Sequence, residues 1–202
     1  MKRLSEWLTG FLIQNGTIDI SEEEIYSYGF QITMANAVNL LIAFLIGCMA
    51  DRLWEVALFY LLFIFSRSYG GGYHADSYGK CLLSFAVCII LMLLASKVLC
   101  VVENHLLIIS GVTFAIYGVT VWWFTPCPNK HVTLTQDEQS QYRKVCKGIL
   151  LITGCIFVLL LEGSFYRAAN VMLVTIWEIV FLLWLGRRIF EKDKRAVVEK
   201  NS

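Results

Sequence analysis

The chain has 202 residues, of which 57% are hydrophobic, and its formal net charge at pH 7 is +1. A mean hydropathy of +0.63 excludes an ordinary soluble domain, and the near-neutral charge gives no reason to expect a nucleic-acid partner. Because the apolar residues come in long blocks, we expect one all-α domain over residues 1–202, a polytopic bundle of membrane helices.

The seven cysteines do not form a recognisable framework. Their number is odd, no two are spaced as C-x-x-C, and most lie in apolar runs, where cysteine behaves as a small buried hydrophobic residue. We therefore expect no disulfide scaffold, metal or cofactor. The N-terminus is not a signal peptide, because Ser5, Glu6 and Gln14 interrupt its apolar residues.

Residues 1–30 are expected to form interfacial N-terminal helices. Apolar side chains recur at helical spacing on one face that is too short to span a bilayer, namely Leu4, Trp7, Leu8, Phe11 and Leu12. Lys2 and Arg3 lie beside this face, which favours a helix on an anionic membrane surface. An amphipathic helix packed on the bundle fits the pattern equally well. Ser21 to Glu24 then fits a capping box that begins a second helix.

Six apolar blocks follow this N-terminal segment, at residues 32–50, 53–66, 81–101, 106–124, 148–162 and 168–186. Several approach the ~20 residues that cross a bilayer. The second and fifth blocks are shorter, so flanking residues must extend them or the membrane must be locally thin. We expect about six spans, of which the second is the least secure.

The 17 lysines and arginines are distributed unevenly along these blocks. If the N-terminus is cytoplasmic, 14 of them are on the inside, in the N-terminal segment, in the two cytoplasmic loops 66–81 and 125–147, or in the tail 187–202, and Lys97 lies near the outer end of the third span. The outer loops hold only Arg52 and Arg167. The positive-inside rule therefore predicts a multi-pass cell-membrane protein with both termini in the cytoplasm.

The loop 66–81 combines a glycine run with a histidine and a cysteine. Cys81 follows Lys80 at the start of the third apolar block, and a helix N-terminus and an adjacent cation both favour a thiolate. His74 is the natural base. In one continuous helix it would lie two turns away, roughly 10 Å, so the intervening segment must fold back, which Gly79 permits.

Other residues of this loop have supporting roles in the same hypothesis. Asp76 could fix the tautomer of the imidazole or, equally, cap the next helix. The amides of Gly71 and Gly72, or the side chain of Arg67, could stabilise an oxyanion. A chance pairing of His74 with Cys81 is one alternative. A metal site formed by His74, Asp76 and Cys81 is another, although a fourth ligand is not evident.

The run R-x-x-x-G-G-x-H-x-x-x-x-x-x-C, formed by Arg67, Gly71, Gly72, His74 and Cys81, resembles the accessory gene regulator B (AgrB) family. The segments EEEIYSYGFQI and TPCPNKHVTLTQDEQSQYRK add to the resemblance, which covers nearly the whole chain. It implies a cytoplasm-facing cysteine endopeptidase that matures an AgrD-type quorum-sensing propeptide. Cys81 and His74 would be catalytic, with Arg67 and Gly72 in support.

The resemblance also implies a two-step reaction, in which Cys81 holds the cleaved peptide as an acyl-thioester before an internal cysteine displaces it as a thiolactone. Lys130 could contact propeptide carboxylates or simply be positive-inside charge. The alternative function is a non-enzymatic small transporter or accessory subunit, with the intramembrane Glu178 on its path. We favour a structural hydrogen bond from Glu178 to Asn36 or Asn39. A homodimer suits so small a bundle.

Overall fold

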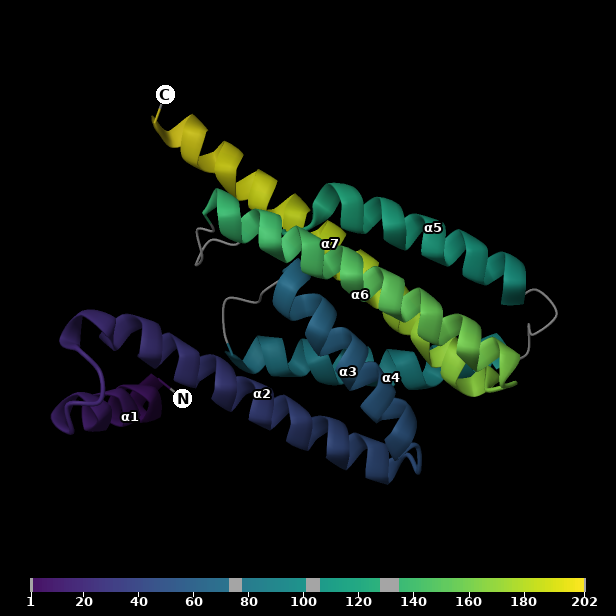
Figure 1. Ribbon diagram of the computed structural model, residues 1–202, viewed down its shortest axis with the longest axis horizontal. Helices are drawn as coiled ribbons and strands as arrows, with labels where there is room; N and C mark the ends of the chain where they lie inside the picture. The colour runs from purple at the N-terminus through teal and green to yellow at the C-terminus, as the bar shows by residue number, and fades with distance from the viewer. Residues whose placement is uncertain (1, 73–77, 101–105, 128–134, 202) are drawn as a thin grey trace.

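Every regular element among the residues that the computed structural model describes is helical, which confirms the all-α prediction (Figure 1). The structure describes residues 2–72, 78–100, 106–127 and 135–201. Along the chain these form α1 (Lys2–Gln14), the 3₁₀ turn η1 (Ile20–Glu22), α2 (Glu23–Met49), α3 (Leu53–Gly70), α4 (Tyr78–Leu99), α5 (Leu106–Phe124), α6 (Gln136–Glu162) and α7 (Tyr166–Asn201).

Five helices within these described ranges are long and apolar enough to cross a membrane, so the chain is a multi-pass membrane protein. They are α2 together with η1, α4, α5, α6 and most of α7. Helix α3, the predicted second span, is not among these five, although it packs against α6 and α7, and its crossing stays a prediction. Its 18 residues include Glu55 and Arg67 and end in a polar turn, which lowers its mean hydropathy.

Two helices begin at side-chain caps. Before α6, the Thr135 amide donates to a Glu138 carboxylate oxygen at 2.8 Å, and the Glu138 amide donates to the Thr135 hydroxyl at 3.4 Å. This T-x-x-E capping box lengthens the short fifth block toward its N-terminus. Before η1, the Asp19 amide donates to Glu22 at 3.4 Å. The helix start predicted at Ser21 therefore lies two residues earlier.

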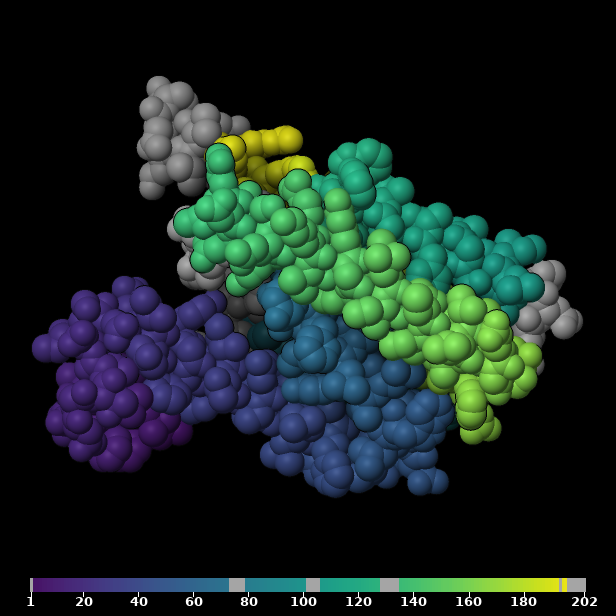
Figure 2. All heavy atoms as spheres, in the orientation of Figure 1, coloured from purple at the N-terminus to yellow at the C-terminus, as the bar shows by residue number. Residues whose placement is uncertain are grey.

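Helix α1 packs on the beginning of α2, and the two form a separate lobe beside the other helices (Figure 2). The side chains with which α1 contacts α2 are small and polar. Ser5 and Thr9 are fully buried, and the Ser5 and Ser27 hydroxyls lie 3.3 Å apart. Trp7 and Phe11 are 64% and 55% exposed. Helix α1 is therefore packed on a helix of the bundle, as one alternative held, but through its polar face, and its apolar face is largely exposed.

Helix α7 is the central element of the remaining bundle and packs against α3, α4, α5 and α6 (Figure 1). Nine consecutive residues, from Ala168 to Ile176, are buried. A helix that is buried on all sides must be surrounded by other helices. Beyond the bundle α7 continues through residues 187–201, so the charged tail is helical.

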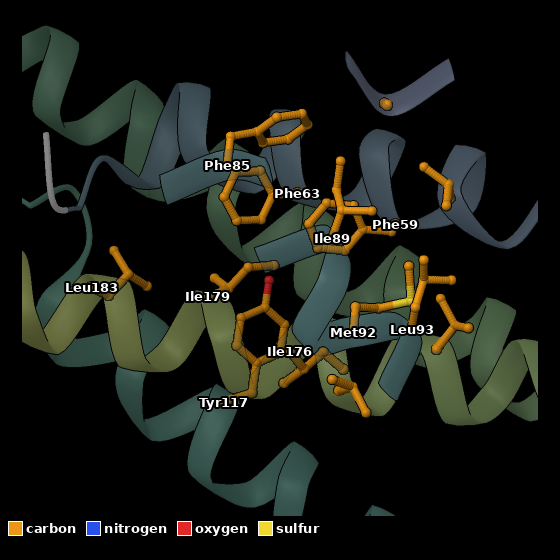
Figure 3. Packing of buried hydrophobic residues seen from close by; sticks show 14 of the residues in the cluster. Phe59, Phe63, Phe85, Ile89, Met92, Leu93, Tyr117, Ile176, Ile179 and Leu183 are labelled. Atoms are coloured by element: carbon orange, nitrogen blue, oxygen red, sulfur yellow. The ribbon is translucent and has the colours of Figure 1, made fainter. Parts of the chain in front are cut away.

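An aromatic cluster joins α3 to α4 within the core (Figure 3). The rings of Phe59 and Phe63 stack at 5.1 Å between centroids, and Phe85 of α4 lies 5.6 Å from Phe63. Tyr60 meets Phe85 edge-on at 6.0 Å. Because lipid is as apolar as these rings, close packing rather than exclusion of water stabilises the contact. The packing fixes the rotation of α4 against α3.

The N-terminal end of α3 is fixed to α4 by Arg52, which also forms a buried ion pair within the start of α3. Arg52 pairs with Glu55, whose side chain is only 2% exposed. The same guanidinium donates to the Leu93 carbonyl at 2.8 Å and to the Ser96 hydroxyl at 3.1 Å. Helices α3 and α4 are therefore held together at this end as well as by the aromatic cluster.

Candidate active site

Cys81 lies in the first turn of α4, is half-buried and carries a free thiol. Phe85 is one turn further along the same face of α4 and contacts Phe63 of α3. Because the chain reverses between the two helices (Figure 1), one turn toward the same end leads to Cys81 on α4 and to Arg67 on α3. Cys81 and Arg67 thus lie toward the same end of the two helices.

The chain leaves α3 through two glycines whose conformations other residues rarely adopt. Gly71 has a φ of 75° and Gly72 a φ of 117°. A Cβ atom on Gly71 would lie 2.8 Å from the Cys127 carbonyl oxygen, and one on Gly72 would lie 3.3 Å from the Leu182 carbonyl oxygen. Both the backbone angles and the close neighbours require glycine here.

Gly79 has a different role from the one expected. It lies in the first turn of α4, and a Cβ atom there would meet no atom within 4 Å. Since its backbone is helical, Gly79 does not provide a fold-back before Cys81. Among the residues that the structure describes between Arg67 and Cys81, the left-handed conformations belong to Gly71 and Gly72.

The glycine turn is bound to the segment that follows α5. The Cys127 amide donates to the Gly70 carbonyl at 2.8 Å, and the Gly71 amide donates to the Arg67 carbonyl at 3.1 Å. The Gly72 amide forms a hydrogen bond to the Cys127 thiol. Both glycine amides are thus engaged within the protein in this arrangement, and their predicted role at an oxyanion stays a prediction.

Cys127 is a component of this turn that the sequence did not single out. Burial raises the pKa of its thiol, and the Gly72 amide and the Arg187 guanidinium partly oppose that rise. Its sulfur lies 4.0 Å from the Leu183 carbonyl oxygen. The position between two prolines was the available signal, but Cys127 looked like the other packing cysteines because its partners are distant in sequence.

Arg67 directs its charge back into the bundle. Its guanidinium lies 5.7 Å from the ring centroid of Phe63, one turn earlier on α3. Arg67 and Glu178 both act electrostatically on Cys88, which lies two turns after Cys81 on the same face of α4. Both side chains therefore lie within electrostatic reach of Cys88, deeper in the bundle than the first turn of α4.

The expected hydrogen bond of Glu178 to Asn36 or Asn39 is not formed. Within the described part of the chain, both carboxylate oxygens of Glu178 are buried without a hydrogen-bond partner, and so is the side-chain oxygen of Asn39. The backbone carbonyl of Asn36 accepts instead from the Tyr60 hydroxyl at 3.3 Å. The hydrogen bond that the sequence predicted from Glu178 to Asn36 or Asn39 is therefore wrong.

Several helix ends converge around the glycine turn. Arg187 of α7 donates to the Trp123 carbonyl at 2.9 Å, and Arg143 of α6 donates to the Thr125 carbonyl at 3.3 Å. These bonds satisfy carbonyls at and just after the C-terminal end of α5, where helical acceptors are lacking. Together with Arg67 of α3, they place arginines of three different helices at one end of the bundle, as the distribution of charge predicts.

His74, Asp76 and Lys130 lie outside the described residues. The same holds for the middle of each predicted cytoplasmic loop, residues 73–77 and 128–134. The pairing of His74 with Cys81 therefore stays a prediction. The structure positions Cys81 itself and, at the end of α3, Arg67, Gly71 and Gly72.

Comparison with known proteins matches residues 5–185 to the family model AgrB, accessory gene regulator B. An AgrB-like protein of Clostridium perfringens (strain SM101 / Type A) is 24% identical over 204 residues, and the alignment covers 92% of this chain and 92% of that protein. No solved structure matches. The matched region includes the glycine turn, Cys81 and all five candidate spans up to residue 185.

Proposed function

Because the chain belongs to the accessory gene regulator B family, we propose that it is a membrane cysteine endopeptidase with Cys81 as its nucleophile. Membership of the family implies the processing of an AgrD propeptide in quorum sensing. The observation that supports Cys81 most directly is its place in the first turn of α4, a free thiol among the unpaired amides of a helix N-terminus.

The proposed reaction begins when the Cys81 thiolate attacks the carbonyl carbon of the scissile peptide bond. His74 takes the thiol proton and returns it to the departing amide nitrogen, which leaves with the C-terminal part of the propeptide. The signal segment stays on Cys81 as a thioester. An internal cysteine thiol of the propeptide then attacks this thioester, the bond to the Cys81 sulfur breaks, and a thiolactone ring is released.

The site must stabilise an oxyanion in both steps. The first amides of a helix lack intrahelical acceptors and lie at the positive end of its dipole. Cys81 lies among those amides in α4, so we place the oxyanion at this helix end. Arg67 and the rigid turn at Gly71 and Gly72 would support the arrangement, and Asp76 would orient His74. Exchange of one thioester for another also needs the exclusion of water, which the membrane boundary favours.

The orientation in the membrane is part of the same proposal. We place both termini, the glycine turn and Cys81 on the cytoplasmic side, because the cations gather at that end of the bundle. The propeptide would approach along the cytoplasmic surface, where Lys130 lies in the second loop. A homodimer remains compatible with this arrangement.

The experiment is the co-expression of single variants with a propeptide substrate. Cys81→Ala and His74→Ala should each abolish cleavage while the protein still inserts into the membrane. Cys88→Ala is the matched control, because Cys88 shares a helix face with Cys81 but lies two turns deeper. Cleavage that continues in Cys81→Ala, or that is lost equally in Cys88→Ala, would reject the assignment.

A further inference from the structure

A hollow of about 430 Å³ lies between the end of α5 and α7. It is lined by Trp123, Phe124, Trp184, Arg187, Arg188 and Glu191. Its volume is within the usual range for small-molecule sites, roughly 300–1,000 Å³. One part of the lining is aromatic and the other is charged, with two arginines against one glutamate.

Arg187 forms the fixed wall of the hollow. It donates to the Trp123 carbonyl at 2.9 Å and to a Glu191 carboxylate oxygen at 3.0 Å, and it lies 4.8 Å from the Phe124 ring centroid. These contacts join α5 to α7 and neutralise Glu191. The charge of Arg187 is therefore largely used within the protein.

Arg188 differs from Arg187 in having its donors open. Its guanidinium stacks over the Trp184 ring at 4.4 Å, and it makes no hydrogen bond or ion pair within the described part of the chain. Guanidinium donors lie in the plane of the group, so stacking leaves the edge accessible to an oxyanion. Two N–H groups on that edge match two oxygens of a phosphate.

The position of the hollow identifies the kind of phosphate. Trp123 and Trp184 are 67% and 42% exposed. Trp123 lies at the end of the candidate span Leu106–Phe124, and Trp184 lies in the last third of the candidate span Tyr166–Lys192, just before Arg187 and Arg188. Exposed tryptophans at such positions mark the boundary between headgroups and acyl chains. Nearby, the Lys147 ammonium lies 3.7 Å from the Trp122 ring centroid, which adds a cation at the same end of the bundle.

We propose that this hollow binds the headgroup of an anionic phospholipid, with the phosphate on Arg188 and the upper acyl chain against Trp123 and Trp184. Basic pockets between membrane helices on the cytoplasmic side are suited to such headgroups. The ligand would brace the ends of α5 and α7 against each other. Its binding is independent of the reaction proposed at Cys81.

The test uses the full chain in detergent micelles, titrated with phosphatidylglycerol or phosphatidylcholine and followed by native mass spectrometry. We expect phosphatidylglycerol to bind more tightly than phosphatidylcholine. Arg188→Gln should weaken phosphatidylglycerol binding about tenfold, as loss of a charged hydrogen bond does. Arg188→Lys should lie between, because a lysine keeps the charge without the planar fork.

Arg195→Gln is the matched control, because Arg195 is an exposed arginine of α7 outside the hollow. It should retain phosphatidylglycerol affinity within about twofold. Equal loss in Arg188→Gln and Arg195→Gln would overturn the proposal in favour of diffuse attraction, as would equal affinity for the two lipids. Displacement of phosphatidylglycerol by an octaglutamate peptide, abolished by Arg188→Gln, would instead identify an acidic-peptide site and also overturn it.

Discussion

Replacement of Gly71 by alanine should destabilise the protein at the turn beside the proposed nucleophile. The substitution places a side chain at a φ of 75°, which costs roughly 1–2 kcal/mol for a residue with a Cβ atom. It also puts that atom 2.8 Å from the Cys127 carbonyl oxygen and 3.3 Å from the Cys127 Cβ. Relief of this clash requires the backbone to shift, so we expect a total loss of about 2–4 kcal/mol.

Thermal unfolding in detergent measures the loss, with tryptophan fluorescence as the signal. For a chain of this length 1 kcal/mol corresponds to about 2–4 °C, so the midpoint should fall by roughly 4–16 °C. Propeptide cleavage should fall as well, because the turn joins the last turn of α3 to the segment that leads to Cys81.

Gly79→Ala is the matched control for this measurement. It adds the same methyl group in a helical conformation with no atom within 4 Å. Alanine is favoured over glycine in a helix by about 1 kcal/mol, so stability should be unchanged or slightly raised. A neutral Gly71→Ala, or equal effects of the two substitutions, would refute the account of the turn.

Three further results are expected from full-length variants. Arg52→Ala should lower stability by about 3–5 kcal/mol, because it leaves the buried carboxylate of Glu55 without its partner; thermal unfolding would show it, and a change below about 1 kcal/mol would contradict the buried pair. Thr9→Leu should cost roughly 1–3 kcal/mol by overpacking a fully buried site. Phe11→Ala should change stability by less than about 0.5 kcal/mol in the same assay; the opposite order would mean that α1 packs through its apolar face. In single-cysteine variants, Cys127 should be alkylated more slowly than Cys81 at pH 7.5, because burial raises the pKa of the Cys127 thiol. Its rate should rise with pH while the pH stays below that pKa, and a rate equal to that of Cys81 would contradict its burial.

The helices of this protein were largely predictable because hydropathy and charge act locally. The predicted block 106–124 coincides with α5, and the first turn of α4 lies where the sequence placed the start of the third span. Helix α3, the predicted second span, is not among the five candidate spans, because Glu55 and Arg67 near its two ends lower its mean hydropathy.

The contacts of the site were less predictable because they join residues far apart in the sequence. The spacing of the glycine motif marks Gly71 and Gly72, but their physical requirement comes from Cys127 and Leu182. The same limit applies to α1. Its periodicity identifies the apolar face, but only its packing through Ser5 and Thr9 shows that this face is exposed.

The most direct test of the central claim uses a propeptide whose internal cysteine is replaced by alanine. The reaction of the protein with this propeptide is quenched, and the mass of the intact protein is measured by mass spectrometry. The account predicts an adduct with the mass of the N-terminal fragment, mapped to Cys81 and released by hydroxylamine as a thioester should be. The adduct should persist in Cys88→Ala and vanish in Cys81→Ala. An adduct on another residue, or cleavage of this propeptide without any adduct, would contradict a covalent role for Cys81.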